Sequence, residues 1–310
     1  MKNRQRRFPL SYQRFATIVK MFCHGFRYLF IIILTTFVFF PIFSSEKSKN
    51  YYQVDEIIKS TNKEINRIIK IAIIDSGINL NDELKDKVVK SYNTINESSI
   101  TNDEFNHGTP VAGIIAGNKI GVNPNVHLYD IQFIGVDGTG QLEHLVKGIE
   151  WAIEEDVDII NLSFGFQKSS AALEDVIKKA NRNNIIVIAA AGNTYGFGVD
   201  YPAKYSNVLS IGSLNEDLSK AYFSGEGKID FVTLGTDLKS INNKGAYDYF
   251  DGTSFSAAYF TGMISLIISK LSDKEAAYQF INDELKKYAY DLGADGRDNK
   301  YGYGLILIKN

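Results

Sequence analysis

The amino-acid sequence predicts an α/β fold: a three-layer α/β/α arrangement with a mainly parallel central sheet. Short, continuous apolar runs alternate with amphipathic segments along most of the chain, which is typical of strands and helices that follow one another around one sheet. The composition of the 310 residues, 45% hydrophobic and 23% charged, suits a chain that buries a large core. These observations exclude a disordered or collagen-like protein.

The strands are predicted from apolar runs that turn residues interrupt. The first run, residues 71–74, leads directly into Asp75-Ser76-Gly77. Because continuous apolar runs are typical of strands that are buried on both faces, we expect a parallel sheet. Four later runs have the same character: residues 126–134, 157–162, 185–190 and 208–211.

Helices are predicted between these strands. The segment 142–155 places Leu145, Ile149 and Ala152 on one face, as expected for a helix that covers a sheet. Further helical patterns cover residues 107–116 and 171–181, and an apolar helix begins near Ser254 and reaches about residue 268.

Residues 1–45 differ from the rest of the chain and are predicted to be a targeting segment. Residues 1–27 carry seven basic side chains and no acidic one, and residues 28–43 are almost entirely apolar. This run is shorter than the ~20 residues that usually span a bilayer, which favours a signal peptide. A poor cleavage site follows it, so a retained membrane anchor through residues 28–43 stays open. In either case we expect the remainder outside the cytoplasm, secreted or attached to the outer face of the cytoplasmic membrane.

The rest of the chain divides into a polar linker or short extension, residues 46–69, and one large domain, residues 70–310. A formal net charge of −2 gives no basic face for nucleic acid. The single cysteine, Cys23, excludes an internal disulfide and a thiolate metal site. Only four histidines occur, without a His-Glu-x-x-His motif, so we do not expect a zinc hydrolase. We expect a monomer.

Four residues of the domain stand where chemistry could occur. Asp75 and Asn193 follow predicted strands, whereas His107 and Ser254 begin predicted helices. Each residue alone is typical of a turn or a helix cap. Together they supply a hydroxyl nucleophile, a base, an acid that orients the base, and a donor for an oxyanion. Parallel sheets bind ligands beyond the carboxyl ends of their strands, where Asp75, Ser163 and Asn193 are expected to lie.

The order Asp, His, Ser along the chain is that of the subtilisins. Residues 70–308 resemble the catalytic domain of subtilisin-like serine proteases (peptidase family S8), most closely in four segments: residues 73–77, 107–113, 190–193 and 252–254. The resemblance implies that Ser254 attacks a peptide carbonyl, that His107 moves its proton, and that Asp75 orients the imidazole, through an acyl-enzyme. It also implies that the Asn193 side chain and the Ser254 N–H hold the oxyanion, with no metal or other cofactor required.

The resemblance further implies where a polypeptide substrate binds. In the family an extended peptide pairs with two strand edges, and alternate side chains enter pockets. The two edges would be Gly138-Thr139-Gly140 and Ser163-Phe164-Gly165, and a wall of the first specificity pocket would include Ala190 and Gly192.

The sequence departs from the family pattern in two places. Residues 255–258 replace the usual Met-Ala-x-Pro after the serine, which could reshape the packing there. The loop 118–124 is shorter than the loop that holds a tight calcium ion in many relatives, so we expect that site to be missing. Asp291, Asp295 and Asp298 could bind calcium weakly, but they lack EF-hand spacing, and a solvated loop is favoured.

Most secreted relatives carry a long folding pro-domain, for which residues 46–69 leave no room. The leading interpretation is an exported serine endopeptidase. Two alternatives stay open: a protease dedicated to processing a leader peptide or propeptide, and an inactive scaffold that binds peptides, against which the intact triad argues. An esterase is disfavoured because the chain contains no Gly-x-Ser-x-Gly motif.

Overall fold

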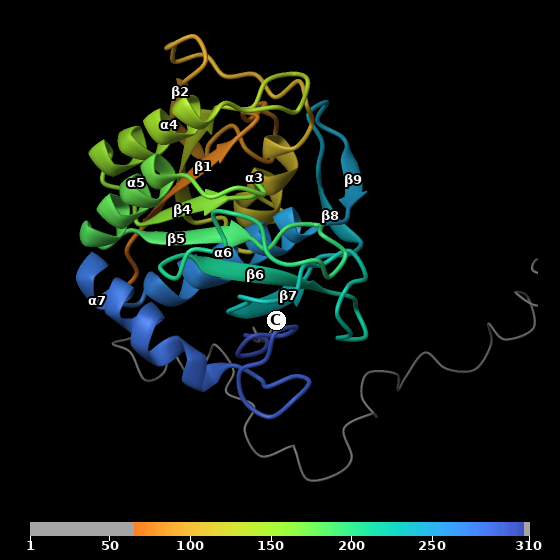
Figure 1. Ribbon diagram of the computed structural model, residues 1–310. Coiled ribbons are helices and arrows are strands. Elements are labelled where there is room, and N and C mark those ends of the chain that lie inside the picture. The colour runs from red at the N-terminus through yellow and green to blue at the C-terminus, as the bar shows by residue number, and fades with distance from the viewer. Residues whose placement is uncertain (1–64, 307–310) are drawn as a thin grey trace, which may run out of the picture. The chain divides into compact units, whose positions relative to one another are not determined.

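A seven-stranded sheet forms the centre of the protein, which a computed structural model describes for residues 65–306 (Figure 1). The strands lie in the order β2-β3-β1-β4-β5-β6-β7, and every neighbouring pair is parallel. This arrangement confirms the predicted α/β class with a mainly parallel sheet. The strands are β1 (Ile69–Asp75), β2 (Val88–Asn93), β3 (Val126–Gln132), β4 (Ile159–Leu162), β5 (Ile186–Ala190), β6 (Leu209–Leu214) and β7 (Phe231–Leu234).

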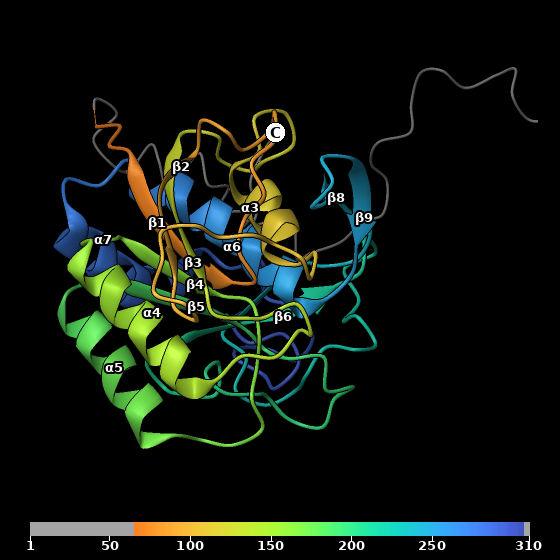
Figure 2. The same ribbon diagram turned by 90° about the horizontal axis from the view of Figure 1, so that it is seen from above.

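Helices cover both faces of the sheet and complete the three predicted layers (Figure 2). On one face, α3 (Gly108–Ala116) and α6 (Thr253–Ile268) pack against each other and against the sheet. Both are buried on almost every side, which explains why their sequences are mostly apolar and contain no charged residue. On the other face lie α4 (Leu142–Glu154) and α5 (Ala171–Arg182).

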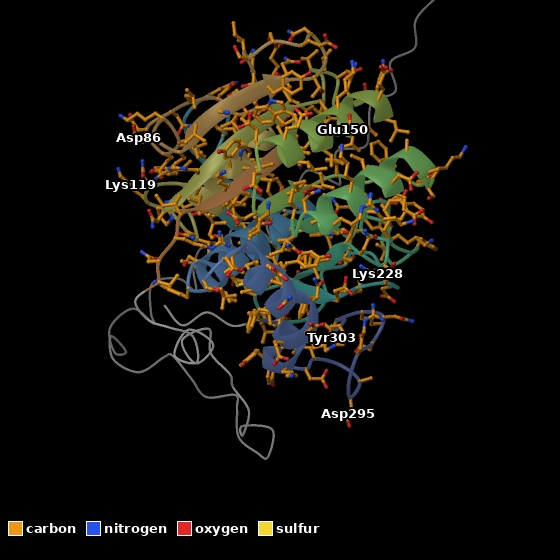
Figure 3. The ribbon with its side chains drawn as sticks, turned by 90° about the vertical axis from the view of Figure 1, so that its left-hand side faces the viewer. Asp86, Lys119, Glu150, Lys228, Asp295 and Tyr303 are labelled. Atoms are coloured by element: carbon orange, nitrogen blue, oxygen red, sulfur yellow. The ribbon has the colours of Figure 1, made fainter. Side chains whose placement is uncertain are left out.

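The amphipathic pattern of α4 has the predicted orientation. Leu145, Ile149 and Ala152 are fully buried against the sheet. Glu150 lies on the outer side of the same helix, in contact with solvent (Figure 3).

Two smaller units complete the domain. The helix α7 (Lys274–Gln279) continues into a π-helical turn (Phe280–Glu284) and a 3-10 turn (Leu285–Tyr288). The helix and the two turns join the core on the α6 side through Ala277, Ile281 and Leu285, respectively. A two-stranded antiparallel hairpin, β8 (Leu238–Ile241) and β9 (Tyr247–Phe250), packs with β8 against α3.

The predicted strands and helices all occur, with ends shifted by up to about three residues. The domain begins slightly earlier than predicted, because β1 starts at Ile69 and the Arg67 guanidinium forms an ion pair with Asp158 (2.7 Å). The sequence pattern does not anticipate β2, β7, the β8–β9 hairpin or α7.

The predicted targeting segment, residues 1–45, and most of the predicted linker, residues 46–69, lie outside the described residues. None of the helices formed by residues 65–306 combines the length and the hydropathy needed to cross a bilayer.

The acidic C-terminal loop hydrogen-bonds to its own backbone. The carboxylate of Asp291 accepts a hydrogen bond from an N–H of the loop (2.8 Å), and that of Asp298 accepts one from the N–H of Tyr301 (2.7 Å). Asp295 projects outward from the domain (Figure 3). Within residues 65–306, His, Cys, Asp and Glu side chains form no group of three that could hold a metal ion. Weak calcium binding here stays a prediction.

Candidate active site

A buried carboxylate at the carboxyl end of β1 pairs with a partly exposed imidazole. Asp75, the last residue of this strand, is 1% exposed and accepts a hydrogen bond from the N–H of Ser76 (2.7 Å). The Nδ1 atom of His107 lies 2.8 and 3.0 Å from the two carboxylate oxygens of Asp75. This contact favours a proton on Nδ1, which leaves the lone pair of Nε2 available as a base. The structure thus brings two of the predicted residues together.

The surroundings of His107 raise its pKa above the usual value. Burial acts in the opposite direction, because a charged imidazolium is poorly solvated there. The Asp75 carboxylate, through its charge and its hydrogen bond, and the more distant Asp103, through its charge, outweigh the effect of burial. The imidazolium that forms when His107 accepts a proton is therefore stabilised.

Asp103, which is not among the residues predicted from the sequence, fixes the start of α3. Its fully buried carboxylate accepts hydrogen bonds from the Ser76 hydroxyl (2.8 Å) and from the N–H groups of Asn106, His107 and Thr109 (2.8, 3.3 and 2.8 Å). The first turn of a helix leaves such N–H groups without partners. An acidic residue five positions before the first helical residue, Gly108, is the signal that could have located this positioning residue.

Ser254 lies in the first turn of α6, and the residue after it, Phe255, contacts the imidazole. The Phe255 ring, with its centroid 5.5 Å from that of His107, brings this turn next to the carboxylate–imidazole pair. The Ser254 hydroxyl donates to the carbonyl of Ser163 (2.7 Å), and the Ser163 hydroxyl donates to the carbonyl of Ser254 (3.0 Å). In this structure, therefore, the Ser254 hydroxyl bonds to a carbonyl and not to His107. Rotation about one torsion changes the partner of a serine hydroxyl.

Asn193 presents an amide donor beside Ser254. Its Oδ1 atom accepts hydrogen bonds from the N–H and the hydroxyl of Thr253, both at 3.0 Å. Because two donors hold the oxygen, the Nδ2 group of this exposed residue remains available as a donor. The N–H of Ser254 lies at the positive end of α6 and has no backbone acceptor among residues 65–306. An oxyanion near Ser254 could accept hydrogen bonds from both groups.

The predicted edge 138–140 lies near the imidazole. The Phe105 ring packs against Gly138, where a side chain would overlap it. The same ring has its centroid 6.3 Å from that of His107. Thr139 is exposed.

The predicted edge 163–165 lies beside the first edge. The Phe133 ring packs against Gly140, where a side chain would overlap it, and its centroid lies 4.6 Å from that of Phe164. Ser163 is buried against the start of α6, and Gly165 is exposed. The two edges are therefore joined through aromatic contacts at the side of the site.

The predicted pocket wall begins at the end of β5. Ala190 is 2% exposed and pairs with Ile211 inside the sheet, so it offers almost no surface to a substrate. Gly192, with a φ of 97°, instead faces the side chain of Asp200. That side chain also contacts the opposite edge at Gly165. No linear pattern could have located Asp200, because its position depends on the loop that follows β5.

Comparison with known proteins shows the family. Residues 66–304 match the Subtilase family. The chain belongs to the subtilase family. Minor extracellular protease Epr of Bacillus subtilis (strain 168) is 35% identical over 248 residues, which cover 78% of this chain and 38% of that protein. Subtilisin amylosacchariticus of Bacillus subtilis subsp. amylosacchariticus is 35% identical over 252 residues (78% and 65%), and subtilisin DY of Bacillus licheniformis is 34% identical over 251 residues (78% and 89%). The chain thus spans less than two-thirds of the first two relatives.

In this subtilase, the residue after the serine contributes to the site. Phe255 is 6% exposed, and its ring packs between those of His107 and Phe250, with centroid distances of 5.5 and 5.2 Å. The departure from the usual Met-Ala-x-Pro motif therefore places an aromatic ring against the imidazole.

Proposed function

We propose that this subtilase is an exported serine endopeptidase that hydrolyses peptide bonds through an acyl-enzyme. The observation that supports the proposal best is the pairing of His107 with the buried Asp75 beside the helix turn of Ser254. A serine hydroxyl is a weak nucleophile unless an oriented base lies next to it.

Acylation requires the Ser254 hydroxyl to exchange the Ser163 carbonyl for Nε2 of His107. As Oγ attacks the substrate carbonyl carbon, Nε2 takes the hydroxyl proton and Asp75 stabilises the imidazolium. The carbonyl oxygen becomes an oxyanion, which accepts hydrogen bonds from Nδ2 of Asn193 and from the Ser254 N–H. His107 then gives the proton to the leaving amine as the C–N bond breaks.

Deacylation uses the same groups in the reverse order. A water molecule attacks the ester carbonyl while His107 takes one of its protons. The second tetrahedral intermediate collapses, the C–O bond to Ser254 breaks, and the imidazolium returns its proton to Oγ. The proposal assigns no step to a metal ion or an organic cofactor.

A polypeptide would bind in extended form between the two edges. The edges 138–140 and 163–165 lie together beside the candidate triad. Backbone pairing with both edges would hold the scissile carbonyl near Asn193.

The export part of the proposal rests on the sequence of residues 1–45. One similar protein is named a minor extracellular protease. Mass spectrometry of the amino terminus, on protein taken separately from membrane and medium, tests this part. A mature chain in the medium that begins near residue 46 would support cleavage. A full-length chain in the membrane fraction would support an anchor, and a chain found only in the cytoplasm would contradict export.

One observation favours an inactive peptide-binding scaffold as a second candidate: the Ser254 hydroxyl is bonded to the Ser163 carbonyl. The two functions differ in whether peptide bonds break. We expect the purified full-length chain to digest denatured casein and to release a burst of nitrophenol from an activated ester, about one equivalent per chain. Ser254→Ala should do neither. Equal digestion by both proteins would overturn the proposal, whereas binding of casein without cleavage by either would establish the scaffold.

A further inference from the structure

A single carboxylate lies between the two walls of the predicted first specificity pocket. A Cβ atom built on Gly165 would lie 2.9 Å from Oδ2 of Asp200, and one built on Gly192 would overlap the same oxygen. The two glycines therefore leave the space that this carboxylate occupies. Since Gly165 belongs to one predicted edge and Gly192 to the predicted pocket wall, the Asp200 side chain contacts both segments at once.

The backbone fixes Asp200 in this position. The N–H of Asp200 donates to the carbonyl of Ala191 (3.0 Å), on the side of Gly192. The next residue, Tyr201, exchanges two hydrogen bonds with Phe166 (2.7 and 2.8 Å), on the side of Gly165. The segment 200–201 thus connects the segments that carry Gly192 and Gly165.

This space lies next to the reacting groups. Ser163, at the start of one wall, exchanges hydrogen bonds with Ser254, and Gly192, in the other wall, directly precedes Asn193. A substrate carbonyl held between Ser254 and Asn193 would direct the side chain of its own residue between the walls. That side chain, on the amino side of the cleaved bond, would approach Asp200.

The Asp200 carboxylate has no close partner among residues 65–306. No hydrogen bond or ion pair within this part of the chain uses its oxygens, and the exposed Lys204 acts on it only through space. Burial raises the pKa of Asp200, and Lys204 lowers it in part. A carboxylate that is partly buried without a partner gains from a cation placed beside it.

We propose that Asp200 forms the base of the first specificity pocket and selects arginine or lysine at the residue before the cleaved bond. This inference rests on the proposed function, because it assigns the substrate class of the same site. Arginine suits the pocket best, since its planar guanidinium can donate two hydrogen bonds to one carboxylate. A glutamate in the same position would be repelled.

The test compares full-length enzymes on fluorogenic peptides that differ only in the residue before the cleaved bond: Arg, Lys, Leu or Glu. The parent enzyme should give a higher kcat/KM for Arg than for Leu, by about 10-fold or more. Asp200→Asn should reduce the Arg-to-Leu ratio by about 10- to 100-fold. Glu174→Gln, which removes one charge from the outer surface of α5, serves as the matched control and should leave the ratio unchanged. A parent without a preference for Arg, or an Asp200→Asn variant that slows all four peptides equally, would overturn the inference.

A binding measurement separates this inference from the proposed function. Benzamidine, a planar cation, can be titrated calorimetrically into Ser254→Ala, which needs no catalytic activity to bind it. We expect saturable binding that weakens about 10-fold or more when Asp200→Asn is added. If Ser254→Ala binds benzamidine but the parent enzyme cleaves no peptide, the protease is refuted and the pocket is kept. If the parent cleaves peptides but Ser254→Ala does not bind benzamidine, the pocket is refuted and the protease is kept.

Discussion

Replacing Asp103 by asparagine tests how the fold positions the base. Asp103 does not touch the substrate in the proposed mechanism, but its carboxylate holds the loop and the helix turn from which His107 projects. The substitution preserves the shape of the side chain and removes its charge. Its effect therefore measures the hydrogen bonds and the electrostatic field of this one group.

The expected magnitude follows from the four hydrogen bonds of Asp103. The amide keeps one oxygen, which can continue to accept from Ser76, Asn106 and His107, but its NH₂ group then faces the N–H of Thr109. Loss of a charged hydrogen bond costs about 1.5–3 kcal/mol, and a buried N–H without a partner adds about 1 kcal/mol or more. Thr109 is fully buried, so water cannot replace the lost partner. We expect the free energy of unfolding to fall by about 3 kcal/mol.

Urea unfolding in a Ser254→Ala background, which prevents self-digestion, measures this change. Glu104→Gln is the matched control, because the exposed carboxylate of this neighbouring residue bonds, among residues 65–306, only to the Asn102 side chain (3.1 Å). The control should change stability by less than about 0.5 kcal/mol. In the active enzyme, Asp103→Asn should also move the rise of kcat/KM to lower pH, because Asp103 helps to raise the pKa of His107. Equal stability of Asp103→Asn and the control would refute this reasoning.

Three further predictions concern protonation and metal ions. The kcat/KM value should rise as the pH passes the raised pKa of His107, because only the neutral imidazole can take a proton. A pH profile of the parent enzyme that stays flat would contradict the role of His107. Asp75→Asn should slow hydrolysis by about 10³-fold or more and move the rise of kcat/KM to lower pH. Burial raises the pKa of Asp130 to about 7. The Asp130 carboxyl therefore keeps its proton in the folded state over a pH range in which the unfolded chain, with a pKa of about 4, has lost it. The free energy of unfolding, measured by urea titration, should therefore fall by up to about 4 kcal/mol as the pH rises from about 4 to about 7. Asp130→Asn should remove most of this fall. A fall of the same size in the variant would refute the raised pKa of Asp130. Excess chelator should leave the melting temperature unchanged in calorimetry, and a large drop would reveal a calcium site.

The choice of asparagine at position 130 follows from its contacts. One carboxylate oxygen, Oδ2, accepts hydrogen bonds from the N–H of Ile78 (3.3 Å) and from the Thr101 hydroxyl, and the other is buried without a partner in the described residues. The asparagine oxygen can take the first position, and its amide nitrogen can take the second. The variant thus removes the titrating group while it keeps the hydrogen bonds.

The central strands could be predicted because burial on both faces requires apolar residues at every position. The edge strand β2 could not, since Lys90 and Ser91 are at least partly exposed and interrupt its apolar pattern. The four-residue strands β7, β8 and β9 are too short for a period to be recognised. Helix α6 could be predicted from its long run of mainly apolar residues, although its first two residues are Thr253 and Ser254.

The residues of the site also divide into those that could be predicted from the sequence and those that could not. Asp75 and His107 lie in sequence motifs, and their contact follows from the sheet edge at which β1 ends and α3 begins. Asp103 and Asp200 lie in loops, and each acquires its role only when the loop folds back on a distant segment. The partner of the Ser254 hydroxyl could not be predicted either, because it depends on one side-chain torsion.

Labelling of Ser254 tests the central claim most directly. The full-length chain would be treated with a serine-directed phosphonate, folded and in urea, and the adduct located by mass spectrometry. We expect one adduct, on Ser254, in the folded chain only, and its loss in His107→Ala. An unlabelled Ser254 in the folded chain, or equal labelling in urea, would contradict it.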